Sequence, residues 1–312
     1  MTDASIRIGV SLAEPPAGVD PIHHLRRQID DAATDGFASA WMANIFGADA
    51  LTALAVAGST VPDIELGTAV IPTYPRHPAA LAQQALTAQI ALGGRLALGI
   101  GVSHRMVIED MFGYSFAQPA RHMREYLEVL LPLLRDGAAT FAGQTVTADI
   151  TLSTPRPHRT PVLLAALAPK MLRLAGTVAD GTVLWMTGPE TIASHILPKL
   201  KEAAEEVSRP APRVVCILPV CVTDDVDGTR ERANRLFSIY GRLPSYRAML
   251  DLEGAVGPGD VAIVGDESTV TRQIRSLADF GVTDFVAASF GRDDDAVRTR
   301  CLLSFLASDK AA

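Results

Sequence analysis

Short runs of β-branched and small apolar residues alternate along the whole chain with longer stretches in which apolar residues recur at helical spacing. Strands that alternate with helices of this length are typical of a parallel sheet. The expected strands are Ile6–Ser11, Ser39–Ala43, Ile64–Val70, Leu96–Gly101, Val162–Ala166, Thr182–Met186, Arg213–Thr223 and Thr283–Ser289. The expected helices between them are Pro21–Asp35, Asp49–Ser59, Pro78–Leu92, Arg121–Arg135, Glu190–Val207 and Glu267–Phe280. This eightfold rhythm predicts an α/β fold, a (β/α)8 TIM barrel, with residues 1–312 in one domain.

Two segments exceed the eightfold pattern and predict insertions. Phe141–Leu152 alternates in polarity around Gly143 and Gln144, which predicts a small hairpin before the fifth strand. Gly228–Asp260, after the seventh strand, is far longer than a usual barrel connection and has a helical pattern of its own. Because it follows the carboxyl end of a strand, it is expected over the catalytic mouth as a lid or substrate wall. A dimer-packing helix is the alternative interpretation.

Composition narrows the class of partner. A chain of 312 residues with 48% hydrophobic residues is long enough for one large core, and its net charge of −7 offers no basic field for nucleic acid. No apolar run approaches the roughly 20 residues that cross a bilayer, and the first residues lack a leader pattern. We therefore expect a cytoplasmic protein with a small-molecule substrate. Cys216, Cys221 and Cys301 have no metal-ligand spacing and are predicted to fill the core, and no metal site is expected.

Candidate chemistry lies where strands end, because reactive residues of a parallel barrel come from the carboxyl ends of its strands. After the fourth strand, Gly99 and Gly101 precede Ser103 and His104. Glycines there would let a flat ring approach the backbone, and an imidazole exchanges protons near neutral pH. The pair lacks the third glycine of a dinucleotide fingerprint. A lone histidine is also a common structural residue, so both interpretations of His104 stay open.

The fifth strand runs into a turn of small residues, Ala165, Ala166, Leu167 and Ala168, and Pro169 then opens a helix. Free N–H groups and the positive end of a helix dipole bind phosphate well. The turn is therefore a candidate phosphate site, although an ordinary turn without a ligand fits the same residues.

Other chemistries find no support. The chain has no HExxH, GxSxG or Walker motif, which disfavours metal hydrolysis, acyl transfer and nucleotide hydrolysis. No lysine ends a predicted strand, which disfavours a Schiff-base aldolase. The remaining histidines considered are weaker candidates. His23, His24 and His77 lie at helix starts and are predicted as surface or capping residues, and His122 and His158 lie in polar, arginine-containing stretches.

Taken together, the order and separation of five segments resemble the luciferase-like flavin- and F420-dependent oxidoreductases. These segments are Asp35–Trp41, Gly67–His104, Phe116–Leu134, Val162–Trp185 and Gly281–Ala288. The resemblance implies a homodimeric barrel that holds a flavin-like ring at the carboxyl ends of its strands. It also implies a non-proline cis peptide at Ala69–Val70, which with Ile71 forms a bulge behind the ring.

The resemblance assigns further residues to the cofactor. The turn Ala165–Ala168 resembles the turn that holds the cofactor phosphate in this family, while Gly101, Ser103 and His104 lie beside the redox end of the ring. Related sugar-phosphate dehydrogenases have Glu at the position of His104 and an Asp-His pair shortly after the tryptophan at Trp41. Here that pair is missing, which leaves His104 as the acid-base candidate. Asn44 is a candidate hydrogen-bonding residue for cofactor or substrate.

The predicted function is an F420-dependent oxidoreductase that transfers a hydride between the deazaflavin and an unidentified small organic substrate. The alanine-rich, lysine-poor composition is typical of GC-rich genomes, among which F420-using actinobacteria are common, and this favours F420. An FMN-dependent monooxygenase of the same family is the alternative. A non-catalytic flavin-binding barrel is a third hypothesis, and the missing Asp-His pair is the feature that favours it.

Overall fold

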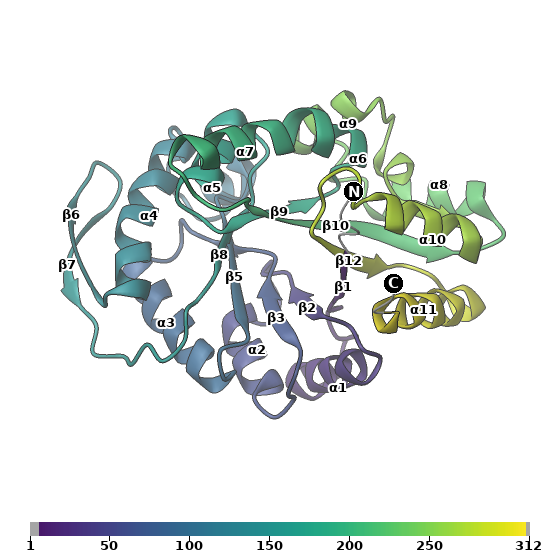
Figure 1. The fold of residues 1–312 in the computed structure, drawn as a ribbon, viewed down its shortest axis with the longest axis horizontal. Coiled ribbons are helices and arrows are strands. Elements are labelled where there is room, and N and C mark those ends of the chain that lie inside the picture. The colour runs from purple at the N-terminus through teal and green to yellow at the C-terminus, as the bar shows by residue number, and fades with distance from the viewer. Residues whose placement is uncertain (1–5, 310–312) are drawn as a thin grey trace.

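Eight parallel strands close into a barrel in the computed structural model, which describes residues 6–309 (Figure 1). Residues 1–5, where the leader pattern was sought, and residues 310–312 lie outside the described residues. Pairing of Arg7 with Asp284 joins the last strand to the first and closes the barrel. The predicted TIM barrel is confirmed. Its strands are β1 (Arg7–Ser11), β2 (Ser39–Met42), β3 (Glu65–Thr68), β5 (Leu96–Gly101), β8 (Val162–Leu164), β9 (Gly181–Trp185), β10 (Arg213–Val222) and β12 (Asp284–Ser289).

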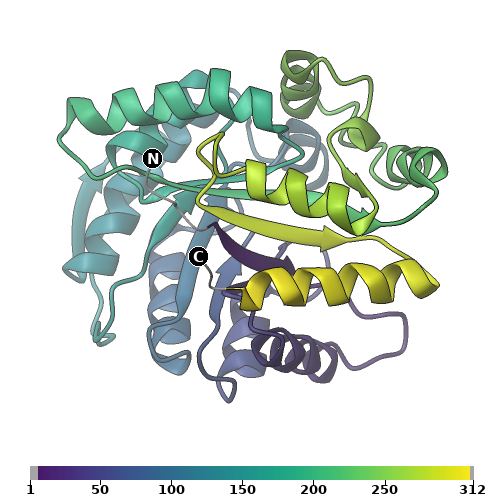
Figure 2. The ribbon, with the colours of Figure 1, turned by 45° about the vertical axis from the view of Figure 1, so that its right-hand side comes forward.

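Helices surround the barrel (Figure 2). In the first, the buried residues Leu25, Ile29 and Ala32 follow helical spacing. The Asp20 carboxylate accepts the N–H of His23 at 2.8 Å and caps the first turn of this helix. The outer helices are α1 (Pro21–Thr34), α2 (Ala50–Gly58), α3 (Pro78–Ala91), α4 (Pro119–Arg135), α5 (Pro169–Thr177), α7 (Leu197–Glu206), α10 (Glu267–Ser276) and α11 (Asp293–Ser308).

Both predicted insertions are present. The hairpin consists of β6 (Ala138–Ala142) and β7 (Thr147–Thr151), which pair antiparallel in a sheet of their own. The longer segment folds into α8 (Val226–Leu236), α9 (Pro244–Glu253) and the 3-10 turn η3 (Pro258–Asp260). We call residues 228–260 the insertion.

Several elements differ from the prediction. The third strand is interrupted at Ala69–Val70 and resumes as β4 (Ile71–Pro72) beside β5. A strand of three residues, β11 (Ile263–Gly265), extends the sheet next to β10 and is too short to show alternation in the sequence. A π-helix, η1 (Met106–Met111), follows β5, and α6 (Pro189–Thr191) with the π-helix η2 (Ile192–Ile196) precedes α7. The wider turns of a π-helix have no simple apolar period, so the sequence pattern does not reveal them.

The cysteine prediction is correct for two residues and wrong for the third. Cys216 and Cys221 are buried in β10, whereas Cys301 is exposed on α11. Apolar neighbours in sequence do not bury a helical residue that lies on the solvent-facing side.

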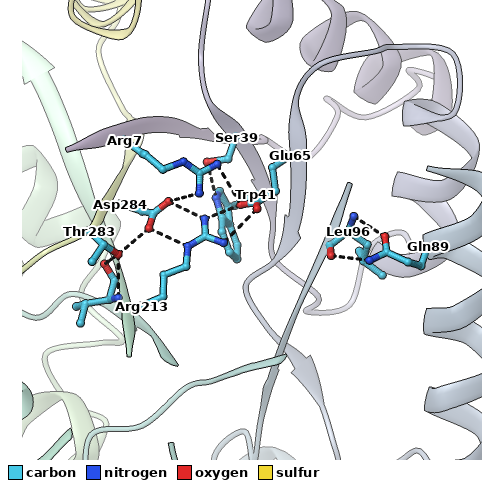
Figure 3. Close-up of polar contacts among 10 residues, drawn as sticks. Arg7, Ser39, Trp41, Glu65, Gln89, Leu96, Arg213, Thr283 and Asp284 are labelled. Atoms are coloured by element: carbon cyan, nitrogen blue, oxygen red, sulfur yellow. Dashed lines mark hydrogen bonds and ion pairs between the residues drawn. The ribbon is translucent and has the colours of Figure 1, made fainter. Parts of the chain in front are cut away.

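An ionic network closes the amino-terminal end of the barrel (Figure 3). The guanidinium group of Arg213 donates to Asp284 at 2.8 and 2.6 Å and to Glu65 at 3.1 and 2.5 Å. Arg7 adds a bond of 2.9 Å to Asp284. Each of these four residues is the first residue of its strand, so the network lies opposite the mouth. The buried ring of Trp41 lies 5.7 Å from the Arg213 guanidinium carbon.

Candidate active site

A cavity of about 600 Å³ opens at the carboxyl ends of the strands, within the size range of small-molecule sites. Strand ends and the loops after them form its inner walls, and η1 and the insertion form its outer walls. It is lined by Ser11, Ala43, Asn44, Ile45, Phe46, Ala69, Val70, Pro72, Pro75, Arg76, Ser103, His104, Met106, Val107, Met111, Phe112, Trp185, Ile217, Ile239, Tyr240, Leu243 and Tyr246.

The bulge after β3 forms part of the inner wall. The Ala69–Val70 peptide is cis, as the family resemblance implies, and both residues line the cavity. The Ala69 N–H donates to the carbonyl of Met42 at 2.8 Å. Behind the bulge, the Thr68 hydroxyl donates to the carbonyl of Gly99 at 2.8 Å and accepts its N–H at 2.9 Å. Ile71, the third residue assigned to the bulge, is fully buried and does not line the cavity.

The two glycines of β5 have a different role from the predicted approach of a ring. A Cβ atom at Gly99 would lie 1.9 Å from the Thr68 carbonyl oxygen. At Gly101, it would lie 2.7 Å from Cγ2 of Val70 and 3.1 Å from Cβ of Ala165. Gly101 is buried and does not line the cavity. Glycine is therefore required here so that the bulge and β8 can pack against β5.

His104 lies in the loop between β5 and η1 and lines the cavity. Ser103 before it adopts a left-handed conformation with φ of 60°, which ends the strand and turns the chain. Burial lowers the pKa of His104, so its imidazole is neutral at neutral pH. Its ring centroid lies 5.6 Å from that of Tyr246 in the insertion. Within residues 6–309, no side-chain hydrogen bond engages its ring nitrogens, which leaves them available to a ligand.

Asn44 also lines the cavity, from the loop after β2. Its side-chain oxygen accepts the N–H of Ala50 at 3.0 Å, at the start of α2. This bond fixes the amide group and leaves its two N–H donors for a ligand. The sequence analysis missed Arg76, which lines the cavity and forms an ion pair with Asp49. These residues are 27 positions apart, so no local pattern signals the pair.

The turn Ala165–Ala168 lies outside the residues that line the cavity. Ala166 is fully buried and presents no surface to a ligand, whereas Ala168 is exposed at the start of α5. No side chain caps this helix. The carbonyl of Leu167 lies 2.9 Å from Nε2 of His195. The structure thus brings Asn44, Ala69, Val70, Ser103 and His104 together, but not the proposed phosphate turn with them.

His77 caps α3 as predicted, whereas His122, which comes from a polar, arginine-containing stretch, is buried. His122 is only 8% exposed on α4, and its Nε2 lies 3.1 Å from the Thr73 hydroxyl. Its ring stacks on Tyr74 with centroids 3.9 Å apart. Burial lowers the pKa of His122 to about 4. The neighbouring arginines give this stretch a polar sequence, although the side chain of His122 faces the interior.

Among residues 6–309, no group of three or more His, Cys, Asp or Glu side chains is arranged to hold a metal ion. In the same part of the chain, every helix is too short or too polar to cross a bilayer.

Comparisons with known proteins agree with the fold. The family model described as luciferase-like monooxygenase matches residues 4–284. A Mycobacterium tuberculosis protein provisionally named a coenzyme F420-dependent oxidoreductase is 31% identical over 193 residues, 57% of this chain and 55% of that protein. The 5,10-methylenetetrahydromethanopterin reductase of Methanopyrus kandleri is 25% identical over 331 residues, 92% and 93% of the two chains. Among solved structures, the oxygenating component of 3,6-diketocamphane monooxygenase of Pseudomonas putida, in complex with FMN, has a TM-score of 0.76 at 17% identity and 97% coverage of each chain.

Proposed function

Because this chain belongs to the luciferase-like monooxygenase family, we propose that it is an F420-dependent oxidoreductase which transfers a hydride between the deazaflavin and a small organic substrate. The observation that carries this proposal is the cavity of about 600 Å³ at the carboxyl ends of the strands, which is lined by the bulge residues Ala69 and Val70 together with His104. Two relatives whose names specify F420 or a methanopterin reductase support a reductase or dehydrogenase. The enzyme class follows from the family, while the cofactor and the substrate are our inference.

The residues of the cavity fit a flat heteroaromatic ring. Ala69, Val70 and Pro72 offer an apolar wall, and Asn44 and Ser103 offer hydrogen bonds to ring heteroatoms. Coenzyme F420, when bound, would supply or accept the hydride. We assign its phosphate to the turn Ala165–Ala168, on the ground that the start of α5 is uncapped and Ala168 is accessible.

His104 is the residue we assign to proton transfer. Hydride transfer to a carbonyl or activated double bond also adds one proton to the substrate, and the reverse reaction removes that proton. A neutral imidazole accepts the proton from a substrate hydroxyl, and in the protonated form it returns it. The same side chain therefore serves both directions, with an effect of about a hundredfold to ten-thousandfold on the rate.

The insertion is proposed as a lid or substrate wall of the single domain 1–312, because Ile239, Tyr240, Leu243 and Tyr246 line the cavity. A homodimer, a cytoplasmic location and the absence of a nucleic-acid partner remain expectations from the family and from the acidic charge.

A titration with F420, FMN and FAD, followed by fluorescence, tests the cofactor. We expect micromolar binding of F420 alone. Binding of FMN alone would favour the monooxygenase alternative, which the FMN-bound Pseudomonas structure with this fold makes the second candidate. Binding of a flavin without turnover of any substrate would favour the non-catalytic barrel.

Two variants test the assigned residues. His104→Gln should lower turnover at least a hundredfold and change the cofactor Kd less than a few fold, while normal turnover would assign the proton transfer to solvent, with Asn44 as a hydrogen-bonding residue. Ala168→Asp should weaken F420 binding by about 1–2 kcal/mol, because it places a negative charge at the start of α5. An unchanged Kd in this folded variant would move the phosphate elsewhere.

A further inference from the structure

We infer that the substrate is a neutral and largely apolar molecule whose reactive polar group is a carbonyl or a hydroxyl, and that Tyr246 of the insertion positions it against His104. This inference rests on the proposed function for the reaction, but its binding test does not depend on the cofactor.

The cavity has almost no free charge. Of the side chains that line it, only Arg76 carries a permanent charge, and that charge is paired with Asp49. A carboxylate, phosphate or ammonium group would lose its hydration in this cavity without gaining a free counter-ion. With Asn44 and Ser103 assigned to the cofactor ring, Ser11 and the neutral His104 offer hydrogen bonds to the substrate. Such groups suit one carbonyl or hydroxyl rather than a charged substrate.

The apolar lining of the cavity continues to the protein surface. Six large apolar residues that line the cavity are also exposed: Ile45, Phe46, Met106, Met111, Phe112 and Ile239. They come from three separate segments, the loop after β2, the region of η1, and the insertion. Exposed apolar residues scattered singly need no explanation, but a set gathered at one opening indicates an apolar ligand. The two methionines adapt to ligands of different shape.

A chain of aromatic contacts links the insertion to His104. Trp185 at the end of β9 meets Tyr240 edge to face at 5.6 Å between centroids, and Tyr240 meets Tyr246 in the same way at 5.1 Å. Tyr246 then lies 5.6 Å from His104. Edge-to-face pairs favour one relative orientation of the rings. Tyr246 therefore holds a defined position beside His104.

A carboxylate anchors this wall to the barrel. Glu253, the last residue of α9, accepts the N–H of Thr191 at 2.7 Å and that of Glu190 at 3.2 Å. The Thr191 hydroxyl donates to the carbonyl of Met249 at 3.2 Å. Since α9 carries Tyr246, these bonds fix the distance between the aromatic wall and the strand ends. The insertion thus sets the width of the space in front of His104.

Three probes that share one ring test the charge preference: 4-bromobenzyl alcohol, 4-bromobenzoate and 4-bromobenzylammonium. Bromine quenches nearby tryptophan, and the chain has two tryptophans. Trp185 lines the cavity, whereas Trp41 is fully buried within the barrel, so quenching reports on the cavity. We expect the alcohol to bind at least tenfold more tightly than either charged probe, with and without F420.

Variants test the role of Tyr246. Tyr246→Ala should weaken binding of the alcohol at least tenfold, and Tyr246→Phe should leave it unchanged, because the ring rather than the hydroxyl forms the wall. Leu236→Ala is the matched control, since Leu236 belongs to the same insertion, is 61% exposed and does not line the cavity. Circular dichroism verifies that each variant is folded.

Three results would overturn the inference. The first is binding of 4-bromobenzoate as tight as that of the alcohol and lost in Arg76→Gln, which would show an anion site at Arg76. The second is no quenching by any of the three probes. The third is binding of all three probes without a preference, in which case the substrate class fails while binding of F420 would still support the proposed function. If the alcohol binds selectively but F420 does not bind, the proposed function fails and the substrate class stands.

Discussion

Replacing Arg213 with methionine should destabilise the barrel through the charge that it leaves behind. The Asp284 side chain is 2% exposed and accepts two bonds from Arg213, one from Arg7 and one of 2.7 Å from the Thr283 hydroxyl. Arg213→Met removes two of these four bonds but keeps an apolar stem over Trp41. Leaving a buried carboxylate underpaired costs about 3–5 kcal/mol.

Arg7→Met is the control, because it touches the same carboxylate from a side chain that is 43% exposed. An exposed ion pair contributes about 0–1 kcal/mol. The two losses should therefore differ at least threefold in the free energy of unfolding. Equilibrium unfolding in urea, followed by tryptophan fluorescence and circular dichroism, measures both, and coincident transitions justify a two-state treatment. Adding Asp284→Asn to Arg213→Met should recover part of the loss. Equal losses for the two arginines would refute the reasoning.

Three further predictions concern burial. Since burial lowers the pKa of His122 to about 4, the unfolded chain takes up this proton first, near its ordinary pKa of about 6.5. The contribution of His122 to stability is then complete above pH 6.5 and falls by up to roughly 3 kcal/mol as the pH drops towards 4. Urea unfolding at several pH values should show a smaller dependence of stability on pH in His122→Gln than in the unchanged protein. An equal pH dependence in the two proteins would indicate an exposed histidine. Gly99→Ala should lower the free energy of unfolding by about 1–3 kcal/mol or more in calorimetry, because its Cβ would lie 1.9 Å from a carbonyl oxygen. Gly241→Ala is the control and should be tolerated, because its Cβ would have its nearest contact at 3.5 Å. Ellman's reagent should label one thiol, Cys301, in the native protein and three after denaturation, and labelling of two native thiols would contradict the burial of Cys216 and Cys221.

Local signals explain why most of the fold could be predicted. Apolar spacing and capping aspartates act within a few residues, so α1 and its neighbours lie within one or two residues of their predicted bounds. The cis bulge could be predicted from the motif around Ala69. What failed depends on contacts between distant segments. Glycine is required at position 99 because Thr68, 31 positions away, packs against it, and His122 is buried because its ring stacks on Tyr74. A single sequence carries no period or cap that reports such contacts.

The two ends of the insertion have a consequence for how such enzymes diverge. The chain leaves the barrel after Val222 and returns at β11, where Ile263 pairs with Val220. The points at which the chain leaves and re-enters the barrel are thus adjacent in one sheet. Closure of the barrel depends on the pairing of β10 with β12 and not on the segment between β10 and β11. Segments of other length or composition can be exchanged at this point without a change in strand order. A different segment at this point would therefore change one wall of the cavity and leave the strands beside the bulge unaltered.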